Sequence, residues 1–163
     1  MFRPMRRKNQ ALSHEECELI LNKATSGVLA LSGDDNYPYA VPLSYVYDNG
    51  RIYFHCARSG HKIDAISRNE KASFCVIDQD LVIPEEYTTY FRSVIVFGKI
   101  RILTDEKEKR LAIEKLAERY APDAEAHERQ KAIDKDYAPL CMLELTIEHM
   151  SGKEAIELAK KKN

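Results

Sequence analysis

The residues best suited to chemistry are five consecutive ones, Arg58-Ser59-Gly60-His61-Lys62. Ser59 can cap the start of a helix, and Gly60 lets a ligand approach the backbone closely because it has no side chain. Three cationic or titratable side chains stand beside the free N–H groups of such a helix start. A phosphate group needs this combination of donors. Taken alone, however, such a segment is more often an ordinary capped helix start with solvated basic residues.

A predicted β-hairpin leads into this segment. Its first strand, residues 37–47, alternates bulky residues with mostly smaller ones, so one face packs while the other lets a ligand lie close to the backbone. Asn49-Gly50 is a typical hairpin turn, and the return strand covers residues 51–57. His55 lies near the end of this strand, where it is either a hydrogen-bonded core residue or a ligand contact.

The other elements must position these residues. Ser13 and Glu16 form a capping-box pattern that opens an amphipathic helix running to about Lys23. Gly98 predicts a bend or bulge in a long strand, and Pro84 a loop over residues 78–86. Further strands are expected at residues 26–31, 72–77, 87–103 and 140–147. Further helices are expected at residues 60–69 and 105–120, then to about residue 135, and at 153–162.

Strands dominate the first two thirds of the chain and are joined by hairpin links. This order predicts a mainly β fold, a small antiparallel barrel decorated by helices, in one domain covering residues 1–163. Side chains fill the interior of so small a barrel. A cofactor would therefore bind outside, on the barrel wall.

Composition excludes several classes of protein. The chain has 163 residues, is 44% hydrophobic and 31% charged, and carries a net charge of −1, which argues against a general nucleic-acid binder. No apolar stretch reaches the length of a membrane span, and no signal peptide follows the basic start, so a cytoplasmic location is expected. The four cysteines lack metal-site spacing, so we expect reduced thiols and no metal.

Three motifs occur in order between Tyr37 and Ile66: Tyr-Pro-Tyr-Ala-Val-Pro-Leu-Ser-Tyr, Ile-Tyr-Phe-His-Cys-Ala and Gly-His-Lys-Ile-Asp-Ala-Ile. They closely resemble the flavin-binding split-barrel superfamily of pyridoxamine 5′-phosphate oxidase, and within it the nitroimidazole-resistance (Nim-type) branch. The resemblance extends from Met5 to Lys153. It implies a six-stranded antiparallel Greek-key split barrel that forms a homodimer and holds FMN in a groove at the subunit interface.

The resemblance also implies which residues contact the cofactor. The strand against the ring and ribityl chain would be Pro42, Leu43, Ser44 and Tyr45, and the next strand end would be Phe54, His55 and Cys56. The phosphate clamp would be Gly60, His61 and Lys62, with a further contact from Ser93. In the oxidases the clamp is an Arg-Lys pair, so His61 replaces the arginine. The oxidases' arginine-containing tail is also missing, which argues against pyridoxal-phosphate synthesis.

Two functions from different classes follow from the resemblance. The first is an FMN-dependent oxidoreductase that takes electrons from NAD(P)H or another donor and reduces small planar nitroaromatic compounds. In it, His61 and His55 are candidate proton donors, and Tyr45 is a candidate for stacking on the flavin ring. The second is a module that binds FMN or haem for storage or sensing without turnover. In both, apolar strand surfaces around Tyr45 and Val94 are candidates for the dimer interface.

Overall fold

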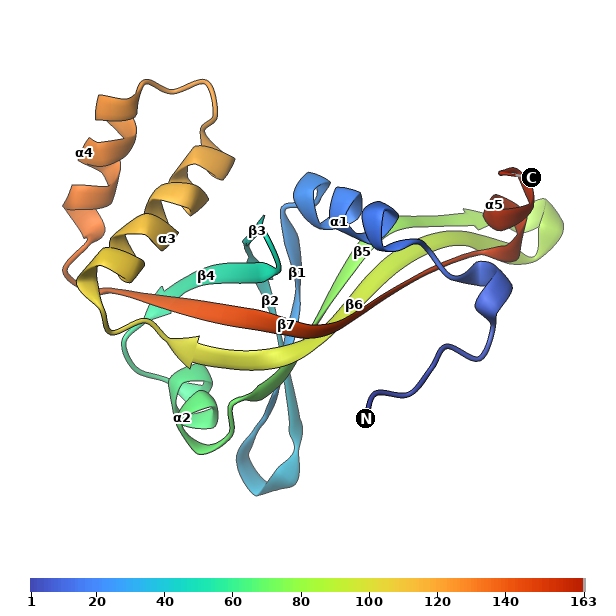
Figure 1. The fold of residues 1–163 in the computed structure, drawn as a ribbon, viewed down its shortest axis with the longest axis horizontal. Coiled ribbons are helices and arrows are strands. Elements are labelled where there is room, and N and C mark those ends of the chain that lie inside the picture. The colour runs from blue at the N-terminus through green and yellow to red at the C-terminus, as the bar shows by residue number, and fades with distance from the viewer. Residues whose placement is uncertain (163) are drawn as a thin grey trace.

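The computed structural model describes residues 1–162 and contains a seven-stranded antiparallel sheet with the strand order β2-β1-β5-β6-β7-β4-β3 (Figure 1). The strands are β1 (Ser26–Ser32), β2 (Pro38–Ser44), β3 (Val46–Asp48), β4 (Arg51–Ala57), β5 (Lys71–Ile83), β6 (Thr88–Ile102) and β7 (Leu140–Glu154). The helices are α1 (His14–Lys23), α2 (His61–Arg68), α3 (Glu106–Tyr120), α4 (Ala126–Asp136) and α5 (Ile156–Lys160). The predicted mainly β antiparallel class is confirmed.

The predicted strand over residues 37–47 is broken at Tyr45. This residue is fully buried, its hydroxyl donates a hydrogen bond to the Leu21 carbonyl at 2.7 Å, and its N–H donates to the Thr25 carbonyl at 3.3 Å. The residues before it form β2, which pairs with β1, and those after it form β3, which pairs with β4. The expected count of six strands is therefore wrong, and the sheet is not closed, because β2 and β3 are its two ends.

Aromatic rings from β4, β5 and the break between β2 and β3 fill the centre of the curved sheet. Phe74 of β5 packs edge-on against Tyr45 and Phe54, with ring centroids 4.9 and 5.1 Å away. The helix α1 begins with the predicted capping box, in which Ser13 and Glu16 exchange hydrogen bonds. Its apolar face joins the same core. This packed interior leaves ligands to bind on the outside.

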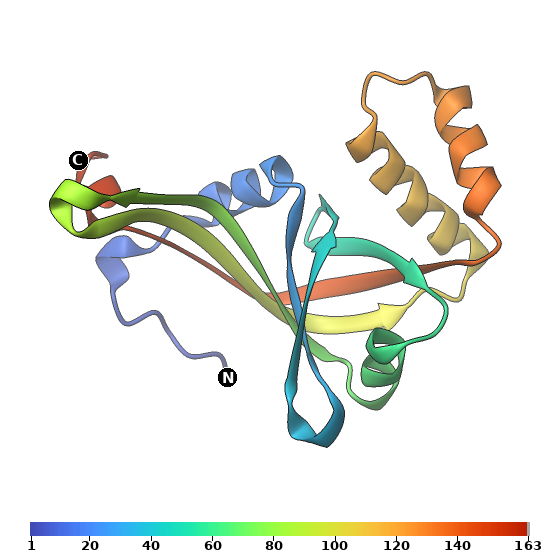
Figure 2. The ribbon, with the colours of Figure 1, turned by 180° about the vertical axis from the view of Figure 1, so that it is seen from behind.

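The strands β5 and β6 extend beyond the barrel as a projecting arm (Figures 1 and 2). The prediction of a loop over residues 78–86 is wrong, because β5 continues to Ile83 after a register shift between Ile77 and Gln79. The predicted irregularity at Gly98 is confirmed by a register shift against β7, where a side chain would collide with the Thr146 carbonyl. The expected tail helix is shorter than predicted because β7 continues to Glu154.

The helices α3 and α4 form a hairpin between β6 and β7 that stands beside β3 and β4 (Figure 1). Ala112 and Leu116 of α3 pack on Val46, Tyr53 and Met142 in a second apolar cluster. The only buried residue of α4 is Ile133. Both helices lie where the sequence predicts them. None of the helices within residues 1–162 has the length and apolar character needed to cross a membrane.

Candidate cofactor-binding site

The strands β2 and β4 diverge from β3 and leave unpaired backbone where they separate. Within the described residues, β2 pairs only with β1, and Phe54–Ala57 pair only with β7. The N–H and C=O groups of such strand edges are available to a ligand. The helix α2 packs against β1 and β6 (Figure 2), and its first residue, His61, stacks on Tyr39 of β2. We use the name split for the open edges of β2 and β4 together with the start of α2, with Pro42, Ser44, His55, Gly60 and Lys62 as its residues.

The start of α2 offers backbone donors to an anion. Gly60 is the N-cap residue, with φ 125° and ψ 179°, and no side chain caps this end, so the prediction of a cap from Ser59 is wrong. The N–H of Asp64 donates to the Gly60 carbonyl, whereas those of the three preceding residues find no acceptor in residues 1–162. Nothing lies within 4 Å of where a side chain at Gly60 would begin. An anion can therefore reach these groups.

The side chains of His61 and Lys62 have different surroundings. The His61 ring stacks on Tyr39 with centroids 3.9 Å apart, and its Nε2 lies 3.8 Å from a carboxylate oxygen of Asp34. Asp34 also pairs with Arg68 at 2.7 Å. Lys62, in contrast, is half-buried and has no carboxylate within ion-pairing distance in the described part of the chain. Lys62 is thus the cation of the predicted clamp that is uncommitted.

Cys56 links the start of α2 to the end of β4. It lies directly opposite Cys141 of β7. Burial, with a further contribution from Cys141, raises the pKa of the Cys56 thiol to about 12, and the nearby Lys62 ammonium partly opposes this rise. Cys56 is therefore protonated at neutral pH and serves packing rather than thiol chemistry.

The side chains of several residues that were predicted to contact the cofactor do not lie at the split. Tyr45 and Phe54 are fully buried, so the expected stacking of Tyr45 on a flavin ring is wrong for this arrangement. Leu43 packs against the core, which leaves its backbone as the available part. Ser93 lies on β6 opposite Ile77 of β5. The part of β6 that lies beside α2 is at Ile100. Roughly 23 Å of extended strand separates Ser93 from Ile100, so Ser93 lies far from α2.

His55 points away from the barrel core and lines a pocket of about 220 Å³ under the helical hairpin. The sequence did not reveal this pocket, because its walls come from α3, α4 and β4 together. Its apolar walls and few polar groups are typical of a small-molecule site. The lining residues are His55, Ile113, Leu116, Ala117, Tyr120, Ala132, Ile133, Asp136 and Leu140.

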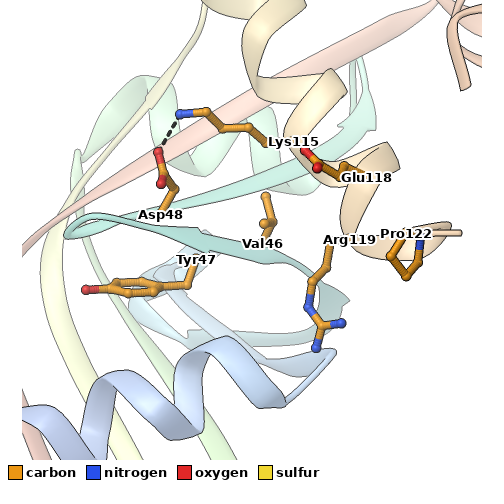
Figure 3. Close-up of a pocket in the computed structure, with 7 residues that line it drawn as sticks. All are labelled: Val46, Tyr47, Asp48, Lys115, Glu118, Arg119 and Pro122. Carbon is orange, nitrogen blue, oxygen red and sulfur yellow. Dashed lines mark hydrogen bonds and ion pairs between the residues drawn. The ribbon is translucent and has the colours of Figure 1, made fainter. Parts of the chain in front are cut away.

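A second cleft, of about 310 Å³, lies between β3 and α3 (Figure 3). Its charged groups serve the scaffold, since Lys115 pairs with Asp48 and Arg119 donates hydrogen bonds to the Lys23 and Ala24 carbonyls at the end of α1. With its cations committed in this way, the cleft is a weaker candidate for an anionic ligand. Its lining residues are Val46, Tyr47, Asp48, Lys115, Glu118, Arg119 and Pro122.

The sequence profile of the pyridoxamine 5′-phosphate oxidase family matches residues 13–154, and the chain belongs to this family. Membership supports a flavin cofactor, and FMN is typical of the family. No match was found among curated proteins.

Solved structures share the fold. A FAD-binding protein from Mesorhizobium loti is 28% identical, with a TM-score of 0.63 and coverage of 90% of this chain and 97% of that one. A candidate 5-nitroimidazole antibiotic resistance protein from Bacteroides thetaiotaomicron is 21% identical, with a TM-score of 0.73 and coverage of 88% and 86%. A FAD- and heme-binding protein from Mycobacterium smegmatis is 20% identical, with a TM-score of 0.73 and coverage of 91% and 74%.

Proposed function

We propose that the protein binds FMN at the split and uses it to reduce small, planar, electron-poor compounds such as nitroaromatics. The observation that carries this proposal is the start of α2, where unpartnered N–H groups and the uncommitted Lys62 lie beside the open edge of β4. A phosphate monoester fits this donor set. The fold shared with a FAD-binding protein and with a candidate nitroimidazole-resistance protein supports a flavin and this class of substrate.

In this proposal, residues of the split divide the binding between them. Lys62 and the N–H groups after Gly60 hold the phosphate, and His61 completes the clamp from its position on Tyr39. The exposed edge of β2 at Pro42 and Ser44 and that of β4 at His55 and Cys56 supply backbone groups for the rest of the cofactor. A bound flavin supplies the redox chemistry, because it accepts electrons from a donor such as NAD(P)H and returns them to an acceptor.

His55 is the better candidate for delivering a proton to the reduced substrate. Its side chain is exposed and borders the pocket beside the split. His61 was the favoured donor on sequence grounds, but its Nε2 lies beside the Asp34 carboxylate, which suits a positioning role. An imidazole can both donate and accept a proton, which is what a general acid must do in each cycle.

We also propose a homodimer, with an interface that differs from the one expected. Tyr45 and Val94 are fully buried in the barrel, because their side chains point inward. The neighbouring residues point outward and form an exposed apolar face across β1, β5 and β6, where Val28, Cys75 and Ile95 are opposite one another in register. Its large members are Val28, Ile77, Ile95 and Phe97, which are 38%, 64%, 39% and 40% exposed.

The second candidate function is a flavin or haem carrier without turnover. This candidate is supported by the fold that the chain shares with a FAD- and heme-binding protein. A carrier and a reductase would use the same split, so binding alone does not distinguish them. Reduction does: the visible absorbance of a reductase's flavin bleaches with NADH and returns when nitrobenzene is added, whereas a carrier's does not cycle.

Replacing Lys62 with alanine removes a charge-assisted contact worth about 1.5–3 kcal/mol. FMN affinity, measured by quenching of flavin fluorescence, should fall about ten- to a hundredfold. Lys107→Ala, which removes an exposed lysine from α3, is the matched control and should bind FMN like the wild type. Equal affinity in Lys62→Ala and wild type would refute the clamp.

Placing a charge on the apolar face should separate the subunits. Light scattering should show a dimer for the wild type at micromolar concentration and a monomer for Ile95→Arg, because an arginine would be buried there without a partner. Leu111→Arg is the control, since Leu111 is 58% exposed on α3, away from this face. A wild-type monomer that holds flavin would contradict the proposed interface.

Replacing His55 with glutamine keeps hydrogen bonding but removes titration. Anaerobic reduction of nitrobenzene should slow about 10²–10⁴-fold, the usual effect of losing a general acid, while FMN stays bound. The parallel variant His61→Gln should lose less activity, because His61 positions the clamp. If the wild type reduces no nitroaromatic compound, the carrier is the correct function instead.

A further inference from the structure

The helical hairpin is held together at its rim rather than by a filled interior. Arg110 pairs with Asp134 at 2.7 Å, and the Tyr137 hydroxyl donates to Glu106 at 2.8 Å. Ile133 is the single buried residue that α4 contributes, so the space between α4, α3 and β4 is not filled by side chains. The unfilled space is the pocket of about 220 Å³ at His55.

The pocket has the size and chemistry of a site for one aromatic ring. Sites for drug-sized ligands measure roughly 300–1,000 Å³, so this smaller one suits a single ring with short substituents. Its walls are aliphatic, from residues such as Ile113, Leu116 and Leu140, and Tyr120 adds an aromatic side. Besides the Tyr120 hydroxyl, the lining has a hydrogen-bonding imidazole, from His55, and a carboxylate that disfavours anions, from Asp136.

The pocket adjoins the split through β4. His55 lines the pocket from the outer face of β4, whereas the next residue, Cys56, faces the barrel core and lies close enough to Lys62 for the ammonium partly to oppose the rise in its pKa. A molecule in the pocket would therefore sit on the outer face of β4, at the end of the strand that borders the proposed cofactor site. The helical hairpin would cover it from the solvent side.

We propose that this pocket is the acceptor site and takes neutral, planar aromatic compounds, with the polar substituent of the ring at His55 and Asp136 selecting against anionic analogues. The assignment of this occupant as an acceptor rests on the proposed function. The selection against anions, in contrast, depends only on the residues that line the pocket. Ala132 has the smallest side chain in the wall formed by α4, so a larger residue there would reduce the free volume.

Nitrobenzene and benzoate test the proposal without turnover, because they have similar shapes but nitrobenzene is neutral and benzoate is an anion. Each is titrated into flavin-free and FMN-loaded protein by calorimetry, with no electron donor present. Nitrobenzene should bind saturably and shift the imidazole proton resonances of His55, and benzoate should bind at least about tenfold more weakly because of Asp136. Equal or tighter binding of benzoate, or no saturable binding of nitrobenzene, would overturn the proposal.

Filling the pocket provides the second arm of the test. Ala132→Phe should weaken nitrobenzene binding at least about tenfold and leave FMN affinity unchanged, whereas Ala138→Phe, just beyond α4, should change neither. Unchanged nitrobenzene binding in Ala132→Phe, or a parallel loss of FMN, would overturn the assignment.

The two proposals fail in different ways. If the wild type binds nitrobenzene at His55 but no FMN, the proposed function fails and the pocket remains. Should Ala132→Phe not fold, as judged by circular dichroism, the His55 resonances and the comparison with benzoate still decide the result.

Discussion

The burial of Tyr45 is the constraint on which the rest of the site depends. Its ring fills the barrel beside Phe74, and its hydroxyl is hydrogen-bonded to the end of α1. The chain changes its partner strand at this residue, because β2 before it pairs with β1 and β3 after it pairs with β4. This change of partner leaves open edges on β2 and β4, where backbone groups are available to a ligand.

In the proposed site, electrostatics favours one end of the split for an anion. The helix dipole and the unpartnered N–H groups favour negative charge at the start of α2. Asp34 lies beside His61 and Arg68, whereas Lys62 has no carboxylate partner in the described residues. In the proposed clamp, Lys62 would therefore be the cation that neutralises a phosphate, and the clamp would be sensitive to the loss of this one residue.

Sequence reasoning succeeded where the determinants are local. The capping box of α1, the boundaries of α3 and the bulge at Gly98 depend on residues close in sequence or on a single glycine. It failed where strand pairing matters. The alternation of bulky and smaller residues predicts a strand over residues 37–47, but it does not show that Tyr45 divides this strand into two that pair with different partners. The pocket at His55 was missed for a related reason, because three elements distant in sequence form its walls. The grouping of His55, Gly60 and Lys62 into one cofactor site came from the resemblance to the family, because no spacing rule predicts it, and it stays a prediction.

The central claim is that the split recognises the phosphate of the cofactor rather than its ring. The most direct measurement is the affinity of the flavin-free wild type for FMN compared with riboflavin, which lacks the phosphate. Contacts from Lys62 and the N–H groups of α2 should make FMN bind at least about tenfold more tightly, with a preference that weakens as salt increases. Equal affinity for the two flavins would contradict the claim and place the cofactor elsewhere on the molecule.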